Sequence, residues 1–477
     1  MIAAALVALA LAVDETTSDD VSVAPPPSYW HDVRPLLVRH CVGCHQPAKA
    51  KGKLVLTDVP AILRGVRSRG GDEPVVVPGD PDESMLIDSL LPFDDEPPSM
   101  PKDAPPLADA DVDLLRRWIE AGARDDSPPD AGATVSPDAP PVYTAPPVVT
   151  SVTVSPDGAL LAVAGYHEVL LYDPVSLALK ERLIGMSERI ESIAFSPDGK
   201  QLAAVGGSPG RLGEVQIWSV RSGRLRISVP VGHDTLYGAS WSNDGTRVAF
   251  GCPDTAVRVV DAKTGEIVLF QGAHEDWVLD TTFTADDSHL VTVSRDRSMK
   301  LIKVETQQFI DNITSITPGV LKGGLMAVDR HPERDELLIG GADGVAKIFR
   351  TYREKKRVIG DDYNRLKTFP AVPGRAFDVA YGPAGASVAV ASSTGDAGAV
   401  HLFDAALDVE TAASSRWSWD APSGVYSVAF APAGDWLAAG RADGTVTLLN
   451  AADGAPLREL VVLPAAPDPS SPEEGNR

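Results

Sequence analysis

The chain has 477 residues, so two domains, or one large domain with an appendage, are expected. Its 66 acidic and 43 basic residues give a formal net charge of −23. The sequence has no basic stripe of the kind that contacts a nucleic-acid backbone, which excludes nucleic acid as an expected partner. Of its three cysteines, two form one closely spaced pair, which leaves no pair for a structural disulfide.

The N-terminus carries an apolar run, Ile2 to Val13, followed by acidic and polar residues. The run has the length of a signal peptide and is too short to span a bilayer. It contains Ala10-Leu11-Ala12, a small-x-small sequence typical of a cleavage site. We therefore expect residues 1–13 to be a signal peptide and the protein to be exported to the periplasm or cell envelope. No later stretch predicts a membrane span.

Cys41, Cys44 and His45 form a Cys-x-x-Cys-His string. Two thiols at this spacing can add to the two vinyl groups of one haem, and the histidine that follows can ligate the iron. The alternatives are a chance pair, a reactive dithiol or half of a zinc site, but zinc would need further Cys or His ligands, and Cys252 is far away in the sequence. The string therefore predicts one covalently attached haem c with its iron.

Two helices are predicted on either side of this string. The first begins near His31 and places Trp30, Val33 and Leu37 on one face. The second runs over about 108–121 and has aspartates in its first turns and arginines later, as the helix dipole favours. Its apolar face consists of Val112, Leu115, Trp118 and Ile119.

Together these features resemble the planctomycete-type class I cytochrome c domains. The resemblance is carried by Trp30 to Leu37, Cys41 to His45, Val77 to Ser84, Met100 to Lys102 and Leu114 to Ala123. It implies a small all-α cytochrome c domain, which we place at 28–124. Covalent haem attachment in bacteria takes place outside the cytoplasm, which agrees with the predicted export.

The resemblance also implies a sixth iron ligand, Met100, because the family places its distal methionine in a Met-Pro step. Met85 is an alternative, but it lies in an apolar helical run that is typical of a core residue. His31 and His40 are further alternatives. An iron with both axial positions filled, by His45 and Met100, favours one-electron transfer over chemistry on a bound substrate.

Two stretches without hydrophobic periodicity follow the first domain and end the chain. They cover 125–146, rich in Pro, Ala and Asp, and 465–477, rich in Pro, Ser and Glu. Both are expected to be extended or disordered. The second domain is therefore placed at 147–464.

A turn of the type Ser-Pro-Asp-Gly recurs seven times in the second domain. Its copies begin at Ser155, Ser196, Ser242, Thr284, His331, Gly382 and Ala431. Each turn lies between two apolar strands, and two more strands follow, which gives four short strands in each repeat of about 40–45 residues. This pattern predicts an all-β seven-bladed propeller, and the domain resembles WD-repeat propellers.

The resemblance to WD-repeat propellers implies two structural His–Asp pairs, His233 with Asp254 and His274 with Asp296. We expect all four residues to be buried hydrogen-bonding groups rather than ligands or bases. We expect Cys252 to be a small core residue.

Departures from the repeat mark further candidate regions. Residues 206–214 and 393–398 are predicted insertions in the second and sixth blades. The one dense basic cluster consists of Arg350, Arg353, Lys355, Lys356 and Arg357. A solvated hairpin is favoured there over a surface that attracts an acidic partner.

The sequence as a whole favours an exported monohaem cytochrome that transfers single electrons, with the propeller binding an unidentified redox partner protein. The alternatives are a haem-dependent oxidoreductase or peroxidase-like enzyme, and an interaction scaffold with a sensory or structural haem. An electron carrier is favoured over a catalyst, and no catalytic residue is predicted.

Overall fold

The computed structural model describes residues 25–462, apart from 69–70, 95, 103, 129–134, 315–321, 359–361 and 408–413. The predicted signal peptide at 1–13 and tail at 465–477 lie outside the described residues. The described chain divides into two compact units. The helical unit holds the residues up to Val33 together with Val76–Ser127, and the propeller unit holds Arg34–Val75 together with the residues from Pro128 onward.

The helical unit contains one short helical turn and two α-helices. They are the π-helical turn η1 (Tyr29–Val33), α3 (Met85–Asp88) and α4 (Asp109–Glu120). Helix α4 confirms the helix predicted at 108–121, and all four residues of its predicted apolar face are buried. Tyr29 packs against Trp118 of α4, with 5.8 Å between the ring centroids. Hydrophobic burial of this face holds the first turn of the unit against its last helix.

The first part of the propeller unit is also mainly helical. Its elements are α1 (Arg34–His40), the 3₁₀ turns η2 (Pro47–Lys49) and η3 (Lys51–Lys53), α2 (Val59–Arg64), and the hairpin of β1 (Val66–Ser68) with β2 (Gly71–Glu73). Asp58 caps α2 by accepting a hydrogen bond from the N–H of Ala61 at 2.9 Å.

The pairing of β1 with β2 departs from the prediction that residues 28–124 form an all-α domain. Gly65 ends α2 in a backbone conformation, with φ of 73°, that an L-residue rarely adopts. The chain then continues extended, and Val66 pairs with Glu73. Among the described residues, no helix is long and apolar enough to cross a membrane.

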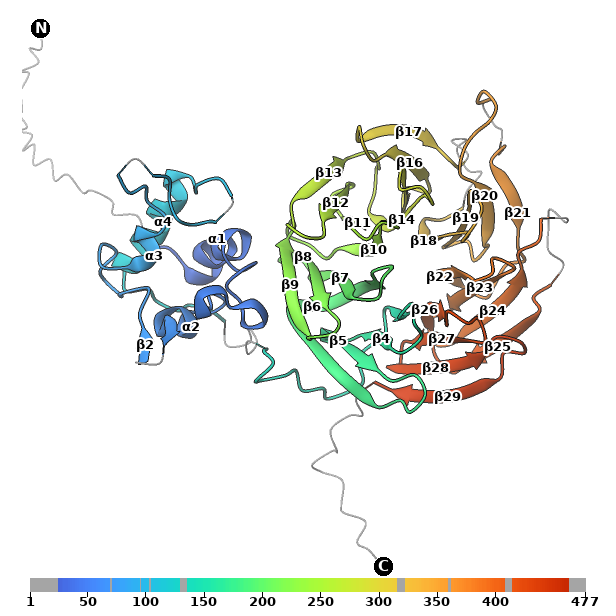
Figure 1. Cartoon of the computed structure of the whole chain (residues 1–477), viewed down its shortest axis with the longest axis horizontal. Helices are drawn as coiled ribbons and strands as arrows, with labels where there is room; N and C mark the ends of the chain where they lie inside the picture. The colour runs from blue at the N-terminus through green and yellow to red at the C-terminus, as the bar shows by residue number, and fades with distance from the viewer. Residues whose placement is uncertain are drawn as a thin grey trace, which may run out of the picture. The chain divides into compact units, whose positions relative to one another are not determined.

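The rest of the propeller unit is a ring of antiparallel blades (Figure 1). The first two blades consist of β3 (Val152–Val154), β4 (Leu161–Ala164), β5 (Tyr166–Tyr172), β6 (Leu179–Phe195), β7 (Gln201–Ser208), β8 (Leu212–Ser219) and β9 (Arg224–Pro230). They form one seven-stranded sheet because the long strand β6 is the outer strand of the first blade and the inner strand of the second.

Five four-stranded blades follow. The third and fourth consist of β10 (Tyr237–Trp241), β11 (Arg247–Gly251), β12 (Val257–Asp261), β13 (Ile267–Gln271), β14 (Val278–Phe283), β15 (His289–Ser294), β16 (Met299–Lys303) and β17 (Gln308–Asn312). The fifth and sixth consist of β18 (Leu325–Arg330), β19 (Glu336–Gly341), β20 (Lys347–Arg350), β21 (Arg365–Thr368), β22 (Arg375–Tyr381), β23 (Ser387–Ser393), β24 (Gly398–Asp404) and β25 (Trp417–Ala421). The seventh consists of β26 (Val425–Phe430), β27 (Trp436–Arg441), β28 (Thr445–Asn450) and β29 (Pro456–Val461).

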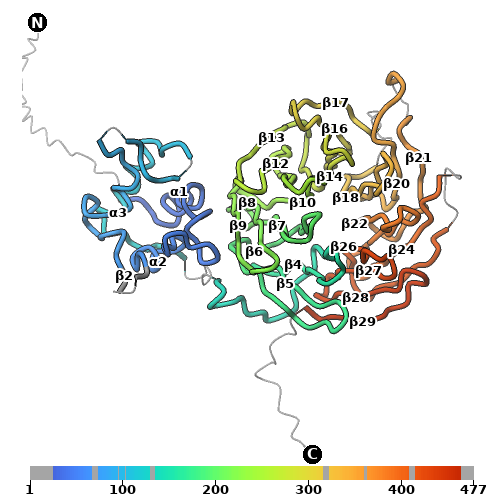
Figure 2. The backbone as a smooth tube through the Cα atoms, viewed as in Figure 1, coloured from blue at the N-terminus to red at the C-terminus, as the bar shows by residue number. Residues whose placement is uncertain are grey.

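The described strands confirm the prediction of seven blades in an all-β propeller. Hydrophobic clusters of buried residues lie between neighbouring blades, as one that joins β10 and β11 to β7 and β8 illustrates. The ring closes where the seventh blade meets the first (Figure 2), since β26 and β27 contact β3. Strand β29 is the outer strand of the seventh blade, so each blade is built from consecutive strands.

A hydroxyl and a carboxylate hold the recurring turn that revealed the repeat. In the second blade Ser196 Oγ donates to Asp198 Oδ1 at 2.7 Å and accepts from the N–H of Gln201 at 3.0 Å. The N–H of Lys200 and the Ser196 hydroxyl lower the pKa of Asp198 to about 2. The same hydroxyl–carboxylate bond recurs at Ser155, Ser242 and Thr284. These bonds explain why the turn keeps Ser or Thr followed two residues later by Asp.

Hydrogen bonds between inner strands join the blades to one another. Each inner strand, and in β6 the half that pairs with β7, is the edge of its own blade, so its free N–H groups need partners outside the blade. Ser192 Oγ accepts from the N–H of Ala239 in the next blade at 3.0 Å. Ser427 Oγ accepts from the N–H of Val152 at 3.0 Å, which links the last blade to the first.

At three other, consecutive junctions between blades, the acceptor of the inter-blade hydrogen bond is a carboxylate instead of a hydroxyl. The bonds run from Val328 N to Asp280 at 2.8 Å, from Tyr381 N to Asp329 at 2.7 Å and from Val428 N to Asp378 at 2.8 Å. Burial, and then repulsion from a neighbouring carboxylate, raise the pKa of Asp280 to about 8 and that of Asp378 to about 6.

The raised pKa of Asp280 predicts that stability falls as the pH rises towards 8. A carboxyl whose pKa is raised by folding contributes its full stabilisation below its unfolded pKa, and this contribution is lost progressively until the pH passes the folded pKa. With an unfolded pKa of 3.8 and a folded pKa of about 8, we expect the contribution of Asp280 to the free energy of unfolding to decline between about pH 4 and about pH 8 and to stay constant above that. Asp280→Asn, which does not titrate, should remove most of the decline between about pH 6 and about pH 8, above the folded pKa of Asp378, in urea titrations. An equal decline in the two proteins would contradict the assignment.

Candidate functional site

Cys41, Cys44 and His45 lie on one backbone turn that follows α1. The N–H groups of Cys44 and His45 both donate to the carbonyl of Cys41, each at 3.1 Å. Further along, the N–H of Lys51 donates to Cys44 O at 3.0 Å and the N–H of Leu56 donates to His45 O at 2.8 Å. The string is therefore a single, hydrogen-bonded structural element, and its thiols are half-buried and form no disulfide.

The electrostatics of this turn suit a bound group better than a reactive dithiol. Burial, reinforced by the nearby Cys44, raises the pKa of Cys41 to about 12, so its thiol is protonated and weakly nucleophilic at neutral pH. Burial lowers the pKa of His45, which favours the neutral imidazole, the form that can bind a metal through a nitrogen lone pair. The Nδ1 atom of His45 is buried without a hydrogen-bond partner among the described residues. This donor set fits a haem c.

The sixth-ligand candidates lie on different parts of the chain. Met100 belongs to the helical unit, where its N–H donates to Ser89 O at 2.9 Å and its side chain is 36% exposed. Met85, which the sequence placed in the core, is 53% exposed, so that prediction is wrong. Met85 opens the short helix α3, whose buried residues are Leu86 and Ile87 instead.

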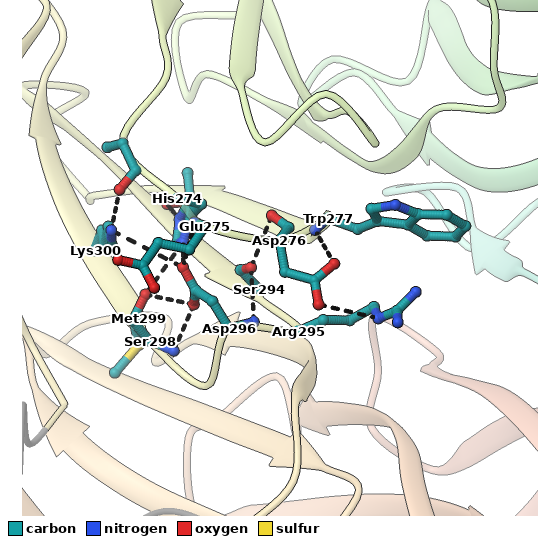
Figure 3. A network of polar contacts seen from close by, with 12 residues as sticks. His274, Glu275, Asp276, Trp277, Ser294, Arg295, Asp296, Ser298, Met299 and Lys300 are labelled. Atoms are coloured by element: carbon teal, nitrogen blue, oxygen red, sulfur yellow. Dashed lines mark hydrogen bonds and ion pairs between the residues drawn. The ribbon is translucent and has the colours of Figure 1, made fainter. Parts of the chain in front are cut away.

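In the propeller, His274 and Asp296 confirm the predicted structural pair. His274 Nδ1 lies 2.8 Å from Asp296 Oδ2 (Figure 3). His274 Nε2 lies 2.7 Å from Thr292 Oγ1. Ser298 Oγ donates to Asp296 Oδ1 at 2.6 Å. Burial lowers the pKa of His274. The hydrogen bond between Asp296 and the imidazole helps to hold the pKa of Asp296 far below its usual value. Both imidazole nitrogens of His274 thus have hydrogen-bonding partners within the blade, which fits a structural role.

The second predicted pair does not form. His233 is exposed, and its Nε2 lies 3.4 Å from the guanidinium of Arg39. Asp254 instead forms a bidentate ion pair with Arg258, at 3.0 and 2.6 Å. Arg258, four residues after Asp254, thus takes the place of the imidazole. This spacing was the feature of the sequence that could have predicted the ion pair.

The two remaining sequence predictions have different outcomes. Cys252 is a buried core residue, as predicted, and burial raises its pKa to about 12. Part of the basic cluster surrounds a tyrosine ring. Arg350, Arg353 and Lys355 lie 4.9, 5.2 and 5.2 Å from the centroid of the Tyr363 ring, in cation–π geometry.

The sequence did not reveal a cavity of about 330 Å³ at the centre of the propeller. All seven inner strands, or the residues next to them, line it. The lining includes Val148, Ser151, Glu191, Ser192, Tyr237, Leu279, Asp280, Met326, Phe377, Asp378, Tyr426 and Ser427. We call this space the channel cavity.

The channel cavity combines aromatic faces with carboxyl groups. Phe377 and Tyr426 meet edge to face at 4.7 Å, and Tyr237 stacks on Trp277 at 5.8 Å. Arg295 lies over the Trp277 ring at 4.7 Å, so one cation–π contact is already made at this side. Aromatic residues at matching places in several repeats were the indication in the sequence that could have located this cavity.

Two family models match parts of the chain. The model described as Planctomycete cytochrome C matches residues 41–104, which include the Cys-x-x-Cys-His string and Met100. The model described as WD domain, G-beta repeat matches residues 265–303 and 414–450. The β-rich part of the chain is thus a WD-type propeller.

The curated relatives resemble about half of the chain. Eukaryotic translation initiation factor 3 subunit I of Aspergillus terreus is 27% identical over 231 residues, which are 46% of this chain and 66% of that protein. The proteins of that name from Coccidioides immitis and Candida glabrata are 27% and 25% identical, over 45% and 48% of this chain and 66% and 71% of theirs. The chain spans slightly less than two thirds of the first of these relatives.

These relatives correct the predicted function. They are named as subunits of a translation initiation factor and are WD-repeat proteins, not cytochromes. No comparison gives evidence of electron transfer, so the prediction of a one-electron carrier, with a haem enzyme as its alternative, is contradicted. What remains is a WD-type propeller, whose repeats indicate binding to other proteins.

The different environments of the two histidines predict different costs of removal. His274→Ala leaves the carboxylate of Asp296 and the hydroxyl of Thr292 without their partner in a buried site, so we expect a loss of about 2 kcal/mol in the free energy of unfolding. His233→Ala should change it by less than about 0.5 kcal/mol, because that side chain is exposed. Urea unfolding of both variants measures the difference, and equal losses would argue against the structural assignment.

Proposed function

We propose that this protein is an interaction scaffold whose propeller binds a partner protein at the channel cavity. The observation that carries the proposal is the cavity itself, which has aromatic and acidic side chains contributed by different blades. The names of the relatives support it, since each is called a subunit of a larger factor. WD repeats support it as well, because they are protein-binding modules.

The chemistry of the channel cavity favours a cationic side chain of the partner. The apolar stem of an arginine or lysine packs on aromatic faces, and its charged head interacts with their π-electrons and with carboxylates. Burial raises the pKa of Glu191, so its carboxylate lacks full compensation in the unbound protein. Cations already lie near this side of the cavity. The charges of Arg189 and Arg295 favour the ionised form of Tyr237, although burial raises its pKa overall. The charge of Arg189 likewise favours the ionised form of Glu191.

The carboxylates at the blade junctions give a second argument. Ser192 and Ser427 make the same inter-blade bond with a neutral hydroxyl, so the fold alone does not require a charged acceptor at Asp378. Burial and repulsion from Asp329 oppose the ionisation of Asp378, but its pKa of about 6 leaves it mainly ionised at neutral pH. Its carboxylate therefore contributes negative potential to the cavity.

A peptide-binding experiment tests the proposal. Acetylated peptides with arginine or lysine at the central position should bind the full chain in isothermal titration, and the same peptides with alanine there should not. Asp378→Ser, which keeps a hydroxyl acceptor, and Tyr426→Ala should each weaken binding about tenfold, roughly the loss of one good cation–π or ionic contact.

The matched control for the aromatic substitution is Phe270→Ala on outer strand β13, where the ring is 55% exposed. It should leave peptide affinity unchanged. Equal weakening by Phe270→Ala and Tyr426→Ala, or equal affinity for the arginine and alanine peptides, would contradict a cavity for cationic side chains.

We also propose that Cys41 and Cys44 attach one haem c, with His45 and Met100 as its iron ligands. What supports this is the spacing of the thiols, the neutral imidazole of His45 and the match of residues 41–104 to a cytochrome model. Such a group would supply an iron centre, and the side chains of Cys41, Cys44, His45 and Met100 would hold it. Export through residues 1–13 and the domain extents 28–124, 125–146 and 147–464 stay part of this proposal.

Haem attachment has a direct readout. After co-expression with a c-type maturation system, haem should stay with the chain on a denaturing gel stained for haem peroxidase activity. Replacing both Cys41 and Cys44 by Ser should abolish the stain, and Cys252→Ser should not, because that thiol is buried in the propeller core. Met100→Ala should keep the covalent haem and lose the methionine-to-iron absorption band. A wild-type chain that never retains haem would overturn the proposal.

A further inference from the structure

The region 206–214, predicted as an insertion, is an extension of two strands. Strands β7 and β8 each have eight residues, and they pair as far as Ser208 with Leu212. The extension brings Glu214 into the blade, where its side chain is 1% exposed. A buried carboxylate is costly unless hydrogen bonds compensate it, so its partners are informative.

Three donors from the second blade compensate Glu214. Ser187 Oγ and Gln216 Nε2 both donate to Oε2 at 2.7 Å, and Ser228 Oγ donates to Oε1 at 2.5 Å. Gln216 is itself fixed, because its Oε1 accepts from Trp218 Nε1 at 3.0 Å. The carboxylate therefore sets the direction of each hydroxyl and amide around it.

The turn that holds the Cys-x-x-Cys-His string reaches this network. Gln46, which follows His45 and is fully buried, donates from Nε2 to Ser228 Oγ at 3.0 Å and to Val42 O at 3.3 Å. Because Ser228 gives its own proton to Glu214, its oxygen is free to accept from Gln46. The amide thus connects the turn to the buried carboxylate through one hydroxyl.

Two further contacts and one charge interaction link the turn to the first two blades. Gly43 approaches β9 so closely that a Cβ there would lie 2.9 Å from Ser228 O and 3.4 Å from Pro230 Cδ. Ala48 packs against the hydrophobic cluster of the first two blades. The Glu214 carboxylate also favours the charged form of Lys49, although burial lowers the pKa of that ammonium group overall.

We infer that the second blade is the docking surface for the turn from Cys41 to Ala50 of this same chain, with Glu214 as its positioning residue. Gly43 provides the close approach, and Gln46 provides the polar connection. The inference does not depend on the proposed partner or on haem attachment. It implies that any group carried by Cys41 and Cys44 is held by the propeller unit.

Hydrogen exchange in the full chain tests this docking. Gly43→Ala inserts a methyl group against Ser228 O, and Gln46→Glu replaces the donor by a second buried carboxylate near Glu214. Each should speed exchange of the amides in residues 41–51 by about tenfold or more, since roughly one buried hydrogen bond or its steric equivalent is lost. Exchange in the fifth and sixth blades should not change.

The matched controls make the same chemical changes elsewhere. Gly272→Ala adds a methyl group where no heavy atom lies within 4 Å, and Gln308→Glu adds a carboxylate on exposed strand β17. Both should exchange like the wild type at residues 41–51. The inference is overturned if Gly43→Ala and Gln46→Glu also behave like the wild type there, or if they accelerate exchange evenly through all blades.

Discussion

The propeller depends on satisfying the backbone groups of seven inner strands that face one another as sheet edges. An edge strand buried at the centre of a ring has N–H groups that its own sheet cannot pair. Here short side chains solve the problem, because an acceptor on one inner strand takes an N–H from the next blade. The bond between Ser427 and Val152 completes the circle without an exchanged strand. These links, together with the hydrophobic clusters between blades, help to place the inner strands that line the channel cavity.

The choice of acceptor connects this constraint to function. Hydroxyls suffice at several junctions, yet three consecutive blades carry Asp280, Asp329 and Asp378. Their raised pKa values mean that burial makes ionisation of these groups costly, so Asp280, with a pKa of about 8, is mainly protonated at neutral pH, whereas Asp378, with a pKa of about 6, is mainly ionised. A cationic group bound in the cavity lowers the cost of ionisation, which links the acidic, aromatic cavity to the proposed scaffold role.

Much of the fold could be predicted from the sequence because local chemistry repeats in it. The hydroxyl–carboxylate turn depends on Ser196 and Asp198, which are two residues apart, and the amphipathic face of α4 depends on residues within one helix. Contacts between distant residues were not accessible in this way. The exposed position of His233 and the bond from Gln46 to Ser228 depend on which blades become neighbours. Function was the least predictable level, since a motif for one cofactor did not determine what the propeller does.

Site-specific photo-cross-linking tests the central claim, that a partner enters the channel cavity. A benzoylphenylalanine introduced at Tyr426, which lines the cavity, is compared with one at Phe270, on outer strand β13. The account predicts that the Tyr426 position forms cross-links to a peptide segment containing arginine or lysine, while the Phe270 position does not. Cross-links from Phe270 with none from Tyr426 would place the partner on the outer rim and contradict the account.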